Sequence, residues 1–126
     1  MSVARRILVV EDEMQFAKMV KLRLESVGYQ VEVVGDAYAG TQKIIREDYD
    51  LIILDLMMPA GGGFSILERI RKFPNKSNLP VIILTGKTVD DAVRSQAKAL
   101  NVAHIFTKPY EAKAFLAAVQ ATIGDV

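Results

Sequence analysis

Five acidic, hydroxyl or basic side chains stand where short apolar runs end in this chain. Glu11 and Asp12 follow the first such run, and Asp55 follows a later one. Thr85 and Lys108 close two further runs. Carboxylates with no histidine or cysteine nearby are hard oxygen ligands that suit Mg²⁺. A carboxylate also accepts phosphoryl groups as a nucleophile, and a hydroxyl and an ammonium stabilise the transferred oxygens. These residue types predict phosphoryl transfer to an aspartate.

The elements that must position these side chains follow from the hydrophobic pattern. Short runs rich in valine and isoleucine are typical of strands, and stretches with helical spacing separate them. The predicted strands lie near residues 7–10, 31–34, 51–54, 81–84 and 104–107. Strands that alternate with helices predict one parallel α/β sheet, doubly wound, with helices on both faces. The carboxyl ends of its strands then meet at one edge, where such folds bind their ligands.

Local signals place several helix boundaries. Apolar residues from Phe16 to Val27 form one stripe, and Gly28 provides a stop. Asp36 is a good N-terminal cap for a helix that reaches Arg46. The second predicted strand alternates apolar and polar residues, which places it near an edge of the sheet, whereas the first, third and fourth are apolar throughout and belong in the middle. Apolar residues at helical spacing also predict a third, a fourth and a fifth helix. Acidic residues begin the fourth of these helices, and Asn101 ends it.

Length and composition limit the possible functions. The chain has 126 residues, so we expect a single domain over residues 1–126. A net charge of +1 gives no field that would favour nucleic acid or an anionic membrane. The sequence has no cysteine and no apolar run of membrane-spanning length. We expect a cytoplasmic protein that neither inserts into membranes nor binds nucleic acid directly.

The order of these motifs resembles the receiver domains of two-component response regulators. The resemblance spans nearly the whole chain, and its marks are Glu11-Asp12, Asp55 with Met58-Pro59, Thr85-Gly86 and Lys108-Pro109. No single motif is specific, but the set in this order and spacing is. The resemblance implies the fold of the family, a flavodoxin-like doubly wound sheet with the strand order 2-1-3-4-5, which is also found in a chemotaxis receiver.

The resemblance also implies roles for individual residues. Asp55 would take a phosphoryl group from a sensor histidine kinase or a histidine phosphotransfer protein. Asp12 would hold Mg²⁺ directly, with Glu11 acting largely through water and Met57 through its backbone carbonyl. The side chains of Thr85 and Lys108 would contact the phosphoryl oxygens. Such a domain assists only its own phosphorylation and dephosphorylation, is not otherwise an enzyme, and acts by binding a downstream protein.

The chain departs from the usual receiver pattern at several positions. Ile105 stands where the family places a switching aromatic ring, and Phe106, one residue later on a strand, is expected in the core. The resemblance implies a cis bond between Lys108 and Pro109. Met57 cannot orient an attacking water as an amide side chain could, which predicts a long-lived phosphorylated state.

One alternative function remains open, and particular residues argue against two others. A degenerate receiver that binds partners constitutively is the main alternative, favoured by Ile105 and opposed by the intact Asp55. A flavin-binding domain would need a Ser/Thr-rich loop after the first strand, and a phosphohydrolase would need an acid in place of Met57. We expect two groups of residues to have no role in a site: a flexible glycine loop and scattered solvated lysines. They comprise Gly61, Gly62, Gly63, Lys72, Lys76 and Lys87.

Overall fold

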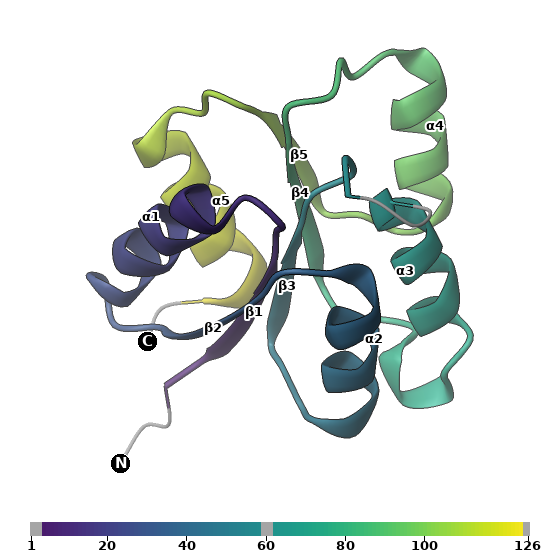
Figure 1. Cartoon of the computed structure of the whole chain (residues 1–126), viewed down its shortest axis with the longest axis horizontal. Coiled ribbons are helices and arrows are strands. Elements are labelled where there is room, and N and C mark those ends of the chain that lie inside the picture. The colour runs from purple at the N-terminus through teal and green to yellow at the C-terminus, as the bar shows by residue number, and fades with distance from the viewer. Residues whose placement is uncertain (1–3, 59–61, 125–126) are drawn as a thin grey trace.

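The chain folds into one five-stranded parallel sheet in the computed structural model, which describes residues 4–58 and 62–124 (Figure 1). The strand order is β2-β1-β3-β4-β5, with every neighbouring pair parallel. This confirms the doubly wound α/β fold and its predicted 2-1-3-4-5 order. The strands are β1 (Arg6–Val10), β2 (Gln30–Val34), β3 (Leu51–Leu54), β4 (Val81–Thr85) and β5 (His104–Thr107).

Helices cover both faces of the sheet. Figure 1 shows α1 and α5 on one side and α2, α3 and α4 on the other. The helices are α1 (Met14–Glu25), α2 (Ala37–Arg46), α3 (Gly62–Arg71), α4 (Asp91–Ala99) and α5 (Ala112–Ile123), with a short 3₁₀ helix, η1 (Pro74–Lys76). Each of the helices α1 to α4 leads from the carboxyl end of one strand back to the start of the next, and α5 follows the last strand. The loops that leave the strands therefore gather at a single edge.

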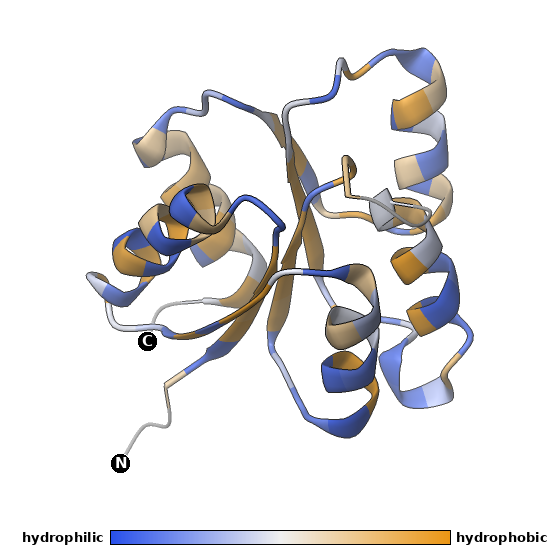
Figure 2. Cartoon of the chain, in the orientation of Figure 1, coloured by the Kyte–Doolittle hydropathy of each residue, from blue (hydrophilic) through white to orange (hydrophobic). Residues whose placement is uncertain are grey.

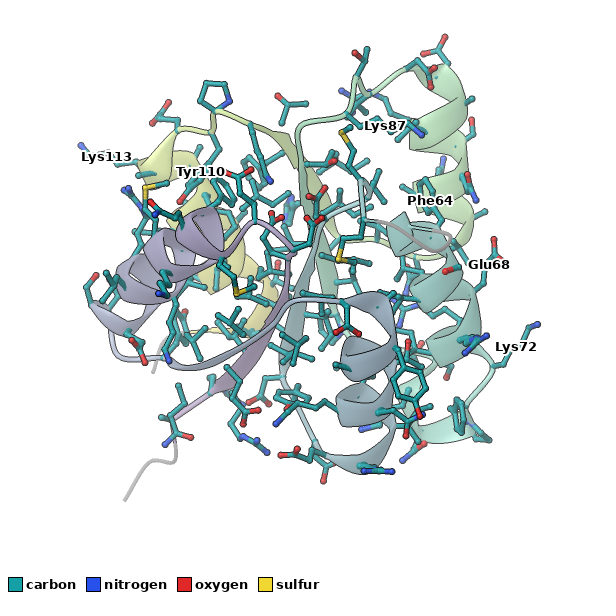
Figure 3. The ribbon with its side chains drawn as sticks, viewed as in Figure 1. Phe64, Glu68, Lys72, Lys87, Tyr110 and Lys113 are labelled. Atoms are coloured by element: carbon teal, nitrogen blue, oxygen red, sulfur yellow. The ribbon has the colours of Figure 1, made fainter. Side chains whose placement is uncertain are left out.

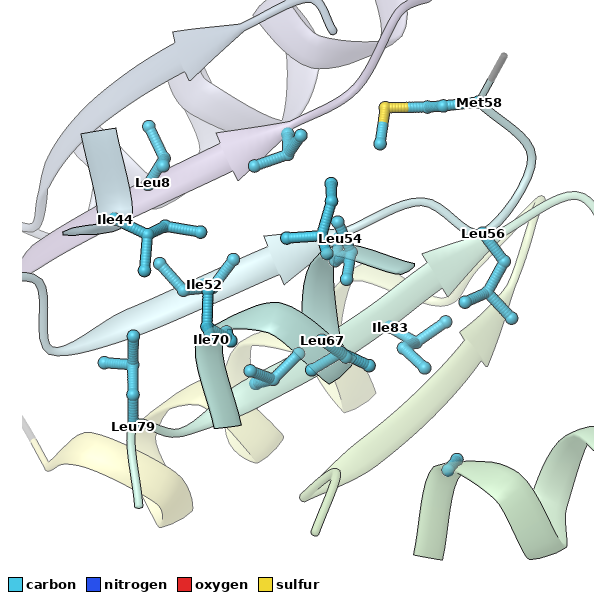
Figure 4. Close-up of a cluster of buried hydrophobic side chains, with 14 of the residues drawn as sticks. Leu8, Ile44, Ile52, Leu54, Leu56, Met58, Leu67, Ile70, Leu79 and Ile83 are labelled. Atoms are coloured by element: carbon cyan, nitrogen blue, oxygen red, sulfur yellow. The ribbon is translucent and has the colours of Figure 1, made fainter. Parts of the chain in front are cut away.

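Alternate residues of each strand supply two separate cores. In β1, Leu8 and Val10 pack on the side of α2–α4, whereas Ile7 and Val9 pack on the side of α1 and α5. All four side chains are buried. Figure 2 shows the apolar strands between the two layers of helices, and Figure 4 shows the larger core. Burial on both faces explains why the central strands are continuously apolar.

The predicted edge position of the second strand is also confirmed. β2 pairs only with β1, and β5 at the opposite edge pairs only with β4. Glu32 of β2 accepts hydrogen bonds from Arg6 at 2.7 Å, Lys43 at 2.9 Å and the Tyr49 hydroxyl at 2.8 Å. The polar residue that broke the apolar pattern therefore joins a charged network at the rim of the sheet.

Most of the predicted helix boundaries agree with the structure. The Asp36 side chain accepts a hydrogen bond of 2.7 Å from a backbone N–H of the first turn of α2. Gly28 and Asn101 have φ angles of 104° and 59°, so both adopt the left-handed conformation that ends a helix. Val27 was wrongly placed on the buried stripe of α1: it follows the helix and is 41% exposed.

Two long cations have structural roles that their sequence context did not indicate. Lys76 was expected to be solvated, but it is only 4% exposed, and its ammonium donates to the Glu47 carbonyl at 2.8 Å. The Arg71 guanidinium donates to four backbone carbonyls that lie around η1 and after α4. Both side chains tie loops at the amino edge of the sheet. Within the described residues, no helix is long and apolar enough to cross a bilayer.

Candidate functional site

The five side chains singled out in the sequence meet at the carboxyl edge of the sheet. Glu11 and Asp12 follow β1, Asp55 follows β3, Thr85 ends β4, and Lys108 follows β5. We call these residues the carboxyl-edge cluster. Figure 3 labels Lys87 and Tyr110 on the loops beside it, after β4 and β5, whereas Glu68 of α3 and Lys72, which follows that helix, project away from it. The parallel topology alone brings together residues almost 100 positions apart.

The Asp55 carboxylate is reached by three donors within the site. Its side chain is buried, with 4% of the residue exposed. One carboxylate oxygen, Oδ1, accepts hydrogen bonds from the Thr85 hydroxyl at 2.8 Å and the Met57 backbone N–H at 2.9 Å. The other, Oδ2, lies 3.4 Å from the Lys108 ammonium. Burial by itself would raise the pKa of Asp55, but these two hydrogen bonds and the nearby positive charge lower it below its usual value.

The pKa of Glu11 is displaced in the opposite direction. It is 3% exposed, its Oε1 lies 2.6 Å from the Lys108 ammonium, and its Oε2 accepts the Glu13 backbone N–H at 3.1 Å. Burial raises the pKa of Glu11 to about 7, with a further contribution from the negative charge of Asp55. The hydrogen bonds from the Lys108 ammonium and the Glu13 N–H lower the pKa, but they offset only part of this increase. Two neighbouring carboxylates with pKa values displaced in opposite directions are typical of a functional site.

Three carboxylates approach one another closely enough to share a cation. One oxygen each from Glu11, Asp12 and Asp55 lies within 4.8 Å of the others. Asp12 is exposed and the other two are buried, so the group opens to solvent on one side. Hard oxygen donors that repel one another, with one side open to retained waters, fit the coordination of Mg²⁺. The residues present therefore fit the metal that the sequence predicted.

Lys108 is held between opposite charges and an aromatic ring. Besides Glu11 and Asp55, its ammonium lies 4.1 Å from the centre of the Phe16 ring, which permits a cation–π interaction. The opposing carboxylates raise the pKa of Lys108 although burial alone would lower it. The peptide bond to Pro109 is cis, as the resemblance implied. No sequence signal indicates that Phe16 belongs to this site, because its place in the apolar stripe of α1 predicts only packing in the core.

Two glycines of the predicted flexible loop are instead required by close packing. A Cβ atom on Gly62 would lie 2.6 Å from the Leu56 carbonyl oxygen, and one on Gly63 would lie 2.5 Å from that of Asp55. Both residues belong to α3, and Gly62 has a φ of 68°. The expectation of a loop was therefore wrong for these two positions, while Gly61 lies outside the described residues. The start of α3 packs directly against the backbone that carries Asp55.

Ile105, at the aromatic switch position, and its neighbour Phe106 lie on opposite faces of the sheet, as successive residues of a strand do. Ile105 packs with the α2–α4 core, and Phe106 packs on the opposite face, where its ring centre lies 5.7 Å from that of Phe115. This confirms that Phe106 is a core residue. Tyr110 also contacts Phe115, at 5.0 Å between ring centres, so its ring contributes to packing near the start of α5.

Comparison with known proteins gives the family. Residues 7–120 match the response regulator receiver domain family. The chain belongs to this family, and it is a receiver domain of the kind found in two-component response regulators. The predicted recognition, fold and class of signalling protein are confirmed.

Curated relatives are longer than this chain. It is 34% identical over 119 residues to the uncharacterized transcriptional regulatory protein YkoG of Bacillus subtilis, covering 93% of this chain and 50% of that protein. It is 36% identical over 117 residues to the transcriptional regulatory protein DltR of Streptococcus agalactiae, covering 91% and 50%. The chain thus spans about half the length of the curated relatives it matches.

Solved receiver structures superpose closely. A CheY-like receiver domain protein from Methanospirillum hungatei has a TM-score of 0.89 at 25% identity, over 96% of this chain and 94% of that one. The receiver domain of the sensor histidine kinase PA1611 from Pseudomonas aeruginosa has a TM-score of 0.86 at 27% identity, over 98% and 100%. That structure holds a magnesium ion in its active-site cleft.

Proposed function

We propose that this receiver accepts a phosphoryl group on Asp55 and changes its binding to a protein partner as a result. The observation that carries the proposal is the environment of the Asp55 carboxylate. It is buried, accepts two hydrogen bonds on one oxygen, and has the other oxygen near the Lys108 ammonium. The lowered pKa keeps it ionised and available as a nucleophile near neutral pH.

In the proposed reaction, one Asp55 oxygen attacks the phosphorus of the donor. A P–O bond to Asp55 forms as the bond between phosphorus and the donor's leaving group breaks. The Thr85 hydroxyl and the Lys108 ammonium already lie beside the two Asp55 oxygens, so they are placed to bind the oxygens of the incoming group. This assigns the acceptor role to Asp55 and phosphoryl contacts to Thr85 and Lys108.

Glu11, Asp12 and Asp55 are proposed to hold Mg²⁺, together with the backbone carbonyl of Met57. The clustered carboxylates support this role, and the magnesium in the receiver of PA1611 shows that a related domain binds this ion. When bound, the ion neutralises charge on the transferred phosphoryl group. Before it binds, Lys108 offsets the repulsion by pairing with Glu11 at 2.6 Å.

Sensor histidine kinases or histidine phosphotransfer proteins are the proposed phosphoryl donors. A downstream protein is the proposed recipient of the signal, since the domain carries a net charge of only +1 and is not expected to bind nucleic acid itself. Its relatives include proteins named as transcriptional regulators, of which the matched region is about half. We propose that residues 1–126 act as one receiver unit and catalyse no reaction on a separate substrate.

Incubation with acetyl phosphate and Mg²⁺ tests this function. The intact mass should rise by one phosphoryl group, and Asp55→Asn should abolish the increase because an amide cannot act as the nucleophile. Chelation of Mg²⁺ should greatly slow labelling. Stoichiometric labelling of the Asn variant, or labelling that is independent of Mg²⁺, would contradict the assignment.

The alternative is a degenerate receiver that binds its partner without phosphorylation. The hydrogen-bonded Asp55 and the paired Lys108 weigh against it, while Ile105 at the switch position favours it. Partner capture that is equally strong for the parent and for Asp55→Asn, with no mass increase in acetyl phosphate, would select this alternative.

A further inference from the structure

Met57 is the most exposed methionine in the part of the chain that the structure describes. It is 58% exposed, compared with 42% for Met14, 44% for Met19 and 5% for Met58. A large apolar side chain this exposed gains little from packing. The sequence contains no cysteine, so no thiol competes with methionine for a mild oxidant.

This exposed thioether adjoins the carboxyl-edge cluster. The Met57 backbone N–H donates to the Asp55 carboxylate at 2.9 Å, which fixes the origin of the side chain. A Cβ atom placed on Gly86 would lie 3.9 Å from the Met57 sulfur and 4.0 Å from Cδ of Lys108. The sulfur and the Lys108 stem thus border the same open space beside Thr85. A change in the polarity of this sulfur would be felt where the phosphoryl group is proposed to sit.

We propose that Met57 is an oxidation site through which hydroperoxides shorten the lifetime of phosphate on Asp55. The thioether sulfur attacks the terminal peroxide oxygen, the O–O bond breaks, and the S=O group forms as water or an alcohol leaves. Sulfur loses two electrons and the peroxide gains them, so no other reactant is needed. The effect on phosphate rests on the proposed function of Asp55, whereas the oxidation itself does not.

The sulfoxide changes both water and charge at the site. A methionine thioether is a weak acceptor that shields the space beside Gly86, whereas a sulfoxide oxygen is a strong acceptor. It can hold a water near the acyl phosphate and can draw the Lys108 ammonium away from the phosphoryl oxygens. Both changes favour hydrolysis. We expect it to accelerate about 2- to 10-fold, the rate equivalent of one hydrogen bond.

Peptide mass mapping tests the site itself. The folded protein is treated with limiting hydrogen peroxide, and the sulfoxide content of each methionine is followed over time. Met57 should be oxidised before Met14 and Met19, and Met58 should be protected until the protein unfolds. Oxidation of Met57 no faster than that of Met58 would overturn the proposal.

The decay of phosphate tests the consequence. Protein phosphorylated with acetyl phosphate after peroxide treatment should lose its label faster than untreated protein. The double variant Met14→Leu, Met19→Leu should keep this response, and Met57→Leu should lose it. Methionine sulfoxide reductase should restore the original rate. An unchanged decay rate after complete Met57 oxidation, or an equal response in Met57→Leu, would refute the effect. Failure of the untreated protein to phosphorylate at all would instead refute the proposed function, and the lifetime effect with it.

Discussion

The raised pKa of Glu11 predicts an unusual pH dependence for the metal-free protein. Burial raises this pKa from 4.5 to about 7 in the folded state. A group whose folded pKa is raised contributes stability that is complete below its unfolded pKa and is lost as the pH rises through the folded one. In EDTA, the free energy of unfolding should therefore decrease between about pH 4.5 and pH 7.

The structure sets the size of this effect. At about 1.4 kcal/mol per unit, the whole shift corresponds to about 3 kcal/mol, and partial sharing of the Lys108 charge makes about 1–3 kcal/mol a reasonable expectation. The acidic groups whose pKa values are lowered, Asp55, Glu32 and Glu47, act in a different range. Glu32, for example, has a pKa of about 2 because of hydrogen bonding to Lys43, and its contribution is lost only in acid.

Urea unfolding of the parent and of Glu11→Gln at pH 5, 6, 7 and 8 measures the prediction. The parent should lose stability across this series, and the variant should not, because its side chain cannot ionise. Near pH 8 the variant should be the more stable of the two in EDTA. Saturating Mg²⁺ should stabilise the parent more at pH 8 than at pH 5, because a protonated Glu11 attracts the cation less. A flat parent profile in EDTA, or an equal slope in Glu11→Gln, would refute the reasoning.

Substitutions of Gly63, Phe16 and Arg71, each with a matched control, probe the packing at the site and at the amino edge of the sheet. Gly63→Ala places a Cβ atom 2.5 Å from a backbone carbonyl oxygen and should cost about 1–3 kcal/mol in urea unfolding. Gly35→Ala meets only the end of a flexible side chain at 3.0 Å and should cost less, so equal losses would contradict the packing argument. Phe16→Leu should slow phosphorylation by acetyl phosphate several-fold by freeing Lys108, and Phe16→Tyr should restore the rate; failure of Tyr to do better than Leu would argue against a cation–π role. Arg71→Met leaves partly buried carbonyls unpaired and should cost about 2–3 kcal/mol, with partial recovery in Arg71→Lys; a loss below about 0.5 kcal/mol would show that water replaces the guanidinium.

Several features of the structure follow from tertiary packing rather than from local sequence. Lys76 stands among polar residues, which is why it reads as solvated, yet a carbonyl from the end of α2 captures its ammonium. Gly62 and Gly63 read as a loop because glycine lacks a local preference, whereas the backbone after β3 approaches them too closely for any side chain. The ring of Phe16 meets Lys108 only because α1 and the loop after β5 adjoin. Such contacts depend on how elements pack, and no spacing along the chain encodes them.

The strand and helix pattern can be predicted from the sequence alone, and so can the edge of the sheet at which the carboxyl-edge cluster forms: Glu11, Asp12, Asp55, Thr85 and Lys108. This is possible because apolar period and parallel topology are properties of the chain and of a few general rules. The electrostatic state of the cluster, in contrast, depends on tertiary packing. Glu11 and Asp55 are both carboxylates at strand ends, yet their pKa values differ. Burial raises the pKa of Glu11, whereas the hydrogen bonds that Asp55 accepts lower the pKa of Asp55. Burial disfavours the charged form of both groups, so their difference arises from the donors and charges that reach each carboxylate, and these are in place only once the helices have packed onto the sheet.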